Sequence, residues 1–171
     1  FGMSLLLPPA YPRIHDEFSN LLAGDTFANA KLANPPHPMA EHFEAMHVLQ
    51  HPKYGSKYPP GQGIFLAVGI LLGHPIIGVW FSLALAGTAM AWAMAPLTGR
   101  PWAAVCGMLF AFTMNCTSYV GQIGYWAHSY WGGAVACLGS ALTLGALIRL
   151  SRSSNDALAI IQNEMMPTGN R

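Results

Sequence analysis

Two adjacent carboxylates, Asp16 and Glu17, are the residues of this sequence best suited to acid–base chemistry. We expect a helix to begin near Asp16, where the positive end of the helix dipole and unpaired N–H groups favour carboxylates. A carboxylate there, close to a membrane surface, can act as a general base or bind a metal ion. An N-capping acid beside a solvated neighbour would have the same sequence, so both interpretations stay open here.

Three histidines recur every five residues, at His37, His42 and His47, with Glu41 and Glu44 between them. Five-residue spacing does not place side chains on one helical face, because faces repeat at three and four residues. One hypothesis is a metal site built from His42, Glu44 or His47. It predicts that His42 and His47 converge with an acid, about 2.0–2.2 Å from the ion. The ordinary alternative is loop histidines that hydrogen-bond the backbone.

Basic residues precede the apolar half of the chain, with Lys53, Lys57 and Tyr58 leading into it. A lysine at the membrane surface can bind a phosphate group as a point charge. The alternative is an interfacial lysine that extends its charge into water. His74 and His128 flank apolar segments, and we interpret both as structural residues.

The charges are few and unevenly placed. Among 171 residues only 9% are charged and 53% are hydrophobic, whereas a soluble domain carries about 25% charged residues. Arg100 is the only formal charge from residue 58 to residue 148. Each charge-free stretch beside it exceeds the roughly 20 residues that cross a bilayer core. The net charge of +1, without a basic stripe, argues against a nucleic-acid partner.

This pattern predicts an all-α, polytopic membrane helix bundle with about three transmembrane helices and an outer loop that contains juxtamembrane amphipathic helices. Residues 1–7 are predicted to end a truncated first span, 8–62 to form the outer loop, 63–150 the transmembrane region and 151–171 a polar cytoplasmic tail. We expect helices from near Asp16 and over 41–50, a short helix over 64–72, and spans over 76–95, 102–120 and 133–148.

Arginines predict the orientation of these spans. With three spans, Arg100 and the pair Arg149 and Arg152 share one side, which the positive-inside rule assigns to the cytoplasm. The loops 8–62 and 121–132 then face outward. Aromatic residues in the second loop, Trp126 and Trp131 among them, are expected in an interfacial belt.

Two stretches carry a family resemblance. The first is PRIHDEFSNLLAGDTFANAKLANPPHPMAEHFEAMHVLQHPKYGSKYPPGQGIFLAVG and the second is GYWAHSYWGGAVACLGSALTLGALIRL. They resemble the first outer loop and a later segment of bacterial GT-C type membrane glycosyltransferases. The closest likeness is to an uncharacterised group related to the protein O-mannosyltransferase and lipid A aminoarabinose transferase superfamily. The resemblance covers about residues 5–150.

The resemblance implies an enzyme that transfers a sugar from a polyprenyl-phosphate donor to an acceptor hydroxyl. Asp16 matches the catalytic base or metal-organising acid of that family, with Glu17 as its companion. Lys57 is the nearest match to the basic residue that contacts the lipid phosphate, with Arg13 second and Tyr58 beside it in the substrate site. A divalent cation is the candidate cofactor. The implied location is the bacterial inner membrane, with loop 8–62 in the periplasm.

Members of that family have many more spans and a large soluble domain, so we expect this chain to be an N-terminal part that is incomplete as an enzyme. The alternative is a non-catalytic membrane module, such as a transporter or assembly fragment. A transporter is expected to carry ionisable residues inside its spans. The predicted spans are almost free of charge, which favours the enzyme.

Overall fold

The computed structural model describes residues 10–42, 44–116, 118–119 and 122–165, and this part of the chain is mainly helical, as predicted. The predicted segment 1–7 lies outside it. Two short antiparallel hairpins pair β1 (Val48–Leu49) with β2 (Gly55–Ser56), and β3 (Ser118–Tyr119) with β4 (Gln122–Ile123). The α-helices of the described residues are α2 (His15–Ala28), α3 (Pro60–Leu71), α4 (Pro75–Thr98), α5 (Arg100–Cys116) and α6 (Gly133–Met165).

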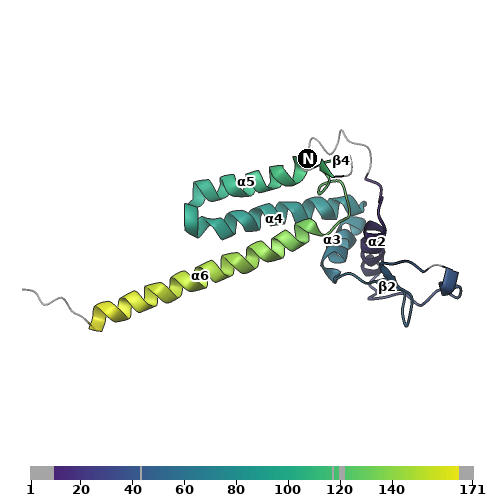
Figure 1. Cartoon of the computed structure of the whole chain (residues 1–171), viewed down its shortest axis with the longest axis horizontal. Helices are drawn as coiled ribbons and strands as arrows, with labels where there is room; N and C mark the ends of the chain where they lie inside the picture. Colours follow the sequence, from purple (N-terminus) through teal and green to yellow (C-terminus); the bar gives the residue numbers. More distant parts are fainter. Residues whose placement is uncertain (1–9, 43, 117, 120–121, 166–171) are drawn as a thin grey trace, which may run out of the picture.

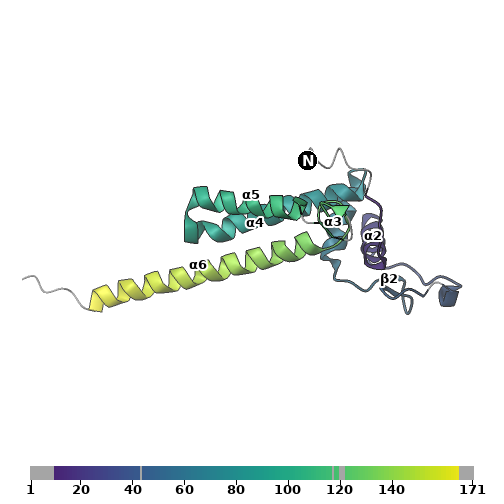
Figure 2. The ribbon, with the colours of Figure 1, turned by 45° about the horizontal axis from the view of Figure 1, so that its top comes forward.

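Three helices form a bundle in which α4 packs against both α5 and α6 (Figure 1, Figure 2). Gly99, at a φ of 80°, joins α4 to α5 in a left-handed conformation that favours glycine. The two helices approach closely, since a Cβ on Gly107 would lie 2.5 Å from the carbonyl oxygen of Gly87. Small residues therefore set the spacing within this pair.

α6 reaches α4 through Trp92. A Cβ on Gly145 would lie 2.3 Å from the Trp92 ring, so only glycine fits there, whereas Gly139 has nothing within 4 Å. Arg149 places its guanidinium carbon 3.7 Å from the centre of that ring and donates a hydrogen bond of 2.7 Å to the Trp92 carbonyl. Of these two glycines, only Gly145 lies against α4.

α2 and α3 lie against each other at one end of the bundle (Figure 1). They pack at very short range, because a Cβ on Gly24 would lie 2.7 Å from Leu66 Cβ and one on Gly63 would lie 2.7 Å from Ala23 Cβ. Leu66 is fully buried in the core formed there. α3 begins earlier than predicted, at Pro60. Proline is tolerated in the first turn of a helix because the backbone N–H that it lacks would have no partner within the helix there.

The predicted helix over 41–50 is wrong. Its described residues form a single 3₁₀ turn, η1 (Ala40–His42), followed by strand β1. Prolines crowd both flanks, at 35, 36, 38 and 52, and the backbones of Asn34 and Tyr54 bridge across the loop. That tertiary pairing overrides the helix propensity of the Glu, Ala and Met residues between the prolines.

Two helices of the described residues, α4 and α6, are long and apolar enough to cross a membrane, each with a mean hydropathy of 1.7 in its most apolar window. α4 matches the predicted span over 76–95. α5 has 17 residues and ends at Cys116 rather than at 120. α6 does not end at 148, as predicted, but continues through Met165, because no proline or glycine interrupts the chain between Arg149 and Pro167.

The charged N-terminal segment and Arg100 lie at opposite ends of the molecule. α2, the β1–β2 hairpin and the start of α6 lie at one end of the bundle, and the α4–α5 turn beside Arg100 lies at the other (Figure 1). In the second loop, Tyr125 and Tyr130 are buried, and Trp126 and Trp131 are half-buried. Tyr125 and Tyr130 therefore pack inside the protein instead of forming an exposed aromatic belt.

Candidate functional site

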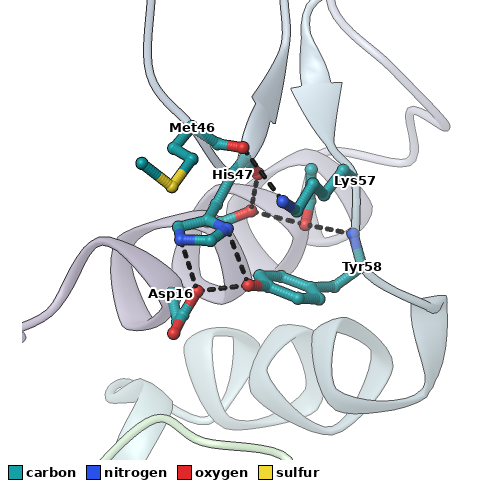
Figure 3. Close-up of polar contacts among 7 residues, drawn as sticks. Asp16, Met46, His47, Lys57 and Tyr58 are labelled. Atoms are coloured by element: carbon teal, nitrogen blue, oxygen red, sulfur yellow. Dashed lines mark hydrogen bonds and ion pairs between the residues drawn. The ribbon is translucent and has the colours of Figure 1, made fainter.

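Asp16, His47 and Tyr58 meet in a triangle of contacts (Figure 3). Asp16 lies in the first turn of α2, His47 directly precedes β1, and Tyr58 follows β2. Asp16 Oδ1 accepts from the Tyr58 hydroxyl and lies 3.0 Å from His47 Nε2. His47 Nδ1 lies 2.8 Å from the same hydroxyl, and the two rings are stacked with centroids 5.6 Å apart.

Two serines, Ser19 and Ser56, fix the hairpin to α2 and so place His47 beside Asp16. Ser19, one helical turn after Asp16 and fully buried, donates to the His47 carbonyl at 2.5 Å. Its hydroxyl also lies 2.7 Å from that of Ser56, whose oxygen accepts from the Tyr58 backbone N–H at 3.1 Å. Each hydroxyl can then donate once and accept once, so this chain of bonds is satisfied.

The second oxygen of Asp16 makes no hydrogen bond within the described part of the chain and points away from His47 (Figure 3). Both donors of the triangle occupy Oδ1, and the Asp16 side chain stays 20% exposed. The bond to Asp16 raises the pKa of Tyr58 to about 12, so Tyr58 keeps its proton at neutral pH. The triangle therefore offers a single carboxylate oxygen to an incoming group.

Glu17 does not join Asp16. Consecutive helical residues point in different directions, and Glu17 turns inward until it is 2% exposed. Its Oε2 accepts the backbone N–H of Arg13, the residue before the N-cap Ile14, at 3.2 Å. Burial raises the pKa of Glu17, and the nearby Arg13 opposes that shift. The N-cap of α2 is Ile14, without a side-chain cap, so Asp16 is not the capping acid.

The predicted basic residues lie near the triangle but outside it. Lys57 is exposed and donates from Nζ to the carbonyl of Met46, the neighbour of His47, at 3.0 Å (Figure 3). Its Nζ lies 5.7 Å from the centre of the Tyr58 ring. Arg13 lies one turn before Glu17 and is exposed. The structure thus brings together Asp16, Lys57 and Tyr58, whereas Glu17 turns to another side of α2 and Arg13 precedes that helix.

A cavity of about 480 Å³ opens beside Asp16, between α2, the start of α3, the loop before α6 and the first turn of α6. Trp126 and Trp131 form an aromatic wall, with ring centroids 6.4 Å apart. The polar groups among the lining residues are few. The lining consists of Asp16, Asn20, Tyr58, Pro59, Gly61, Gln62, Trp126, Trp131, Gly132, Gly133, Val135 and Ala136.

Two polar atoms of this lining have no hydrogen-bond partner among the residues that the structure describes. Gln62 is only 5% exposed and donates from Nε2 to the Tyr130 carbonyl at 3.1 Å, which leaves its Oε1 unpaired. The indole N–H of Trp131 is also buried and unpaired. An unpaired buried group costs about 1–3 kcal/mol. Both atoms are closed to solvent, so the surface that the cavity presents is mainly aromatic and apolar, with Asp16 among its few polar groups.

The residues do not fit a metal ion. No group of three or more His, Cys, Asp or Glu side chains that could hold one occurs in the described ranges. His42 and Glu44 are exposed, and both ring nitrogens of His47 already contact Asp16 and Tyr58. The metal hypothesis that joined His42 to His47 is thus not supported. His74 instead caps α4 by accepting the Ile76 N–H at 3.2 Å.

Sequence reasoning misses several residues of the site. It treats His47 as a metal ligand or a loop histidine that hydrogen-bonds the backbone, and Gln62 as part of a loop. One signal is present on α2, because Asp16, Ser19 and Asn20 share the three-and-four spacing of a helical face. Ser19 and Asn20 are buried, so this polar face points into the protein. No local pattern indicates that Trp131 returns to the same cavity.

No protein-family model matches this sequence, and neither the curated proteins nor the solved structures contain a match to it.

Proposed function

We propose that the chain is the N-terminal part of an integral membrane glycosyltransferase, which transfers a sugar from a polyprenyl-phosphate donor to an acceptor hydroxyl at the outer face of a bacterial inner membrane. The observation that carries this proposal is that Asp16, which keeps one unshared oxygen, lines an aromatic-walled cavity at the polar end of apolar helices. The resemblance of the loop sequence to GT-C type enzymes supplies the donor class.

The cavity suits a pyranose ring. Tryptophan rings such as those of Trp126 and Trp131 stack on the C–H face of a sugar, and a small number of polar side chains in the wall can bind its hydroxyls. Asn20 and Gln62 are the amide side chains of the lining. A polyprenyl tail would lie in the bilayer beside the apolar helices, which keeps the sugar phosphate at the membrane surface.

The chemical step requires one base and one stabilised leaving group. Asp16 accepts the proton of the acceptor hydroxyl as its oxygen forms a bond to the anomeric carbon, while the bond from that carbon to the phosphate oxygen breaks. The electron pair of the broken bond leaves on polyprenyl phosphate, whose negative charge Lys57 offsets. Asp16 then returns its proton to water. Attack opposite to the departing phosphate inverts the sugar carbon.

The alternative, a transporter or assembly fragment, has less support. α4 contains no ionisable side chain from Pro75 to Thr98. A transport pathway is expected to carry such groups within its spans. The polar groups of this chain gather instead around one cavity at the end of the bundle.

The proposal is tested by replacing Asp16. Membranes that contain the full-length protein are given a panel of polyprenyl-phosphate pentoses and hexoses, and released polyprenyl phosphate is measured. We expect Asp16→Asn to lower turnover by about 10²- to 10⁴-fold, the usual contribution of a positioned base. Asp25→Asn, an exposed carboxylate on the same helix, is the matched control and should leave turnover unchanged. Unchanged turnover in Asp16→Asn would contradict the proposal.

A further inference from the structure

The three contacts among Asp16, His47 and Tyr58 need three protons, one for each contact. A carboxylate donates none, and a phenol supplies one. A neutral imidazole also supplies only one, because one of its nitrogens is an acceptor. The closed triangle therefore holds one proton more than a carboxylate, a phenol and a neutral imidazole can provide.

The additional proton belongs on His47. It must lie between Asp16 Oδ1 and His47 Nε2, since the phenol proton and the Nδ1 proton serve the other two contacts. Free histidine holds its proton to about pH 6.5 and free aspartic acid to about pH 3.9. Of the two atoms, the imidazole nitrogen is thus the stronger base.

We infer that His47 and Tyr58 are positioning residues for Asp16, and that the triangle closes only while both ring nitrogens of His47 carry protons. In the closed state both donors hold Oδ1, which leaves the other oxygen for the substrate. When His47 loses a proton, one of the three contacts must open and Asp16 is no longer fixed from both sides. Protonation and the orientation of the carboxylate are therefore linked.

The surroundings of His47 do not supply a competing acid. The charged and titratable groups in contact with it, among the described residues, are Asp16 from α2 and Tyr58 from the segment after β2. Lys57 lies beside them, bound to the Met46 carbonyl. Ser19, which holds the His47 carbonyl, and Ser56, which bonds to Ser19, carry no charge.

A spectroscopic test does not depend on any enzymatic activity. The full-length protein, labelled with ¹⁵N in the imidazole ring of histidine and with ¹³C at tyrosine Cζ, is titrated with base in lipid nanodiscs. The sequence has seven histidines, and the signals of His47 and Tyr58 are assigned from their loss in His47→Gln and Tyr58→Phe. We expect both His47 nitrogens to have imidazolium shifts at the acidic side, and Tyr58 Cζ to change in the same transition.

Tyr54→Phe is the matched control, because Tyr54 lies in the same loop outside the triangle and should leave the His47 transition unchanged. The inference is overturned if the His47 ring changes its protonation state during the titration while the chemical shift of Tyr58 Cζ stays constant. It is also overturned by a Tyr58→Phe variant in which the His47 transition is the same as in the wild type. Either result stands whether or not the protein transfers sugar.

The kinetic test rests on the proposed function. His47 does not line the cavity, so we expect His47→Gln to lower kcat on the order of 10²-fold, as misplacement of a catalytic group does, with KM for the donor unchanged. The decline of kcat at alkaline pH should disappear in that variant. His42→Gln, on the exposed turn η1, should match the wild type. A change confined to KM, or no change, contradicts a positioning role.

If the wild type transfers no sugar while the spectroscopic coupling is present, the proposed function fails and this inference stands.

Discussion

Asp16 and Glu17 show how strongly one residue's position on a helix decides its chemistry. The two carboxylates are neighbours in sequence, yet Asp16 meets His47 and Tyr58 while Glu17 turns into the protein. Asp16 receives two donors and keeps a free oxygen. Glu17 receives one backbone N–H, loses its solvent and has its pKa raised by burial. The pair is therefore not a two-carboxylate site, and only Asp16 reaches the cavity.

Glu17 also gives a prediction about stability. Its pKa is higher in the folded protein than the ordinary value of 4.5. A raised carboxyl pKa contributes stability that is present below the unfolded pKa and lost as the pH rises through the folded pKa. We expect Glu17→Gln to remove that loss, so that its free energy of unfolding falls less than that of the wild type as the pH rises above 4.5.

Denaturant unfolding of both proteins across this pH range measures the difference. Glu41→Gln is the control, because Glu41 is exposed on η1. In the Glu17→Gln variant the new amide oxygen can still accept the Arg13 N–H, so this hydrogen bond is kept. A variant with the same pH dependence as the wild type would show that Glu17 ionises without cost in the folded protein.

At the scale of elements, the position of Asp16 depends on a short hairpin rather than on a long helix. β1 and β2 contribute two residues each, and their place is set by the bonds from Ser19 and Ser56. α2 in turn lies on α3, and α3 lies on α4. Each of these interfaces is held at close range by glycine, so the site is connected to the bundle through two tight helix contacts.

The α3–α4 contact can be tested with a single methyl group. A Cβ on Gly78 would lie 1.9 Å from the backbone oxygen of Phe65, which cannot move aside as a side chain can. We expect Gly78→Ala to lower the free energy of unfolding by about 1–3 kcal/mol or more, the usual cost of overpacking. Gly139→Ala is the control, because nothing lies within 4 Å of its Cβ, and its effect should be small.

Thermal unfolding in detergent compares the two variants with the wild type. Because α3 carries Gln62 and follows Tyr58 directly, Gly78→Ala should also weaken ligand binding in the cavity. An unchanged melting temperature in Gly78→Ala would mean that α3 and α4 separate at little cost.

At the scale of the whole molecule, polar and apolar parts are divided along the bundle. The hairpin, α2 and the cavity occupy one end, and the turn at Arg100 occupies the other (Figure 1). α6 has 33 residues and so extends about 50 Å at 1.5 Å per residue. That length exceeds the roughly 30 Å hydrocarbon core of a bilayer, so α6 would project beyond it.

This division predicts opposite accessibility for the two ends of the protein. In a variant whose three cysteines are replaced by alanine, we introduce Lys53→Cys in the loop or Ser153→Cys on α6. Lys53→Cys should react with a membrane-impermeant maleimide in intact spheroplasts, and Ser153→Cys only after the membrane is permeabilised. Both positions are exposed in the folded chain, so burial does not limit either reaction. Labelling of both from one side would exclude the proposed topology.

Local signals in the sequence determined the helices. Long charge-free runs predicted α4 and about the first half of α6, and the acidic turn at Asp16 predicted the start of α2, because helix formation depends on neighbours within a few residues. The same local reasoning failed at 41–50, where the flanking prolines and the pairing of Asn34 with Tyr54 decided the structure. It also placed the end of the last helix too early.

Tertiary structure alone decided the site. Asp16 and Tyr58 are 42 positions apart and meet only because the β1–β2 hairpin pairs and Ser19 holds it to α2. A sequence states which residues can ionise, but a hydrogen bond needs two atoms within about 3 Å and suitably aligned. That condition depends on the packing of separate elements, which no local pattern contains.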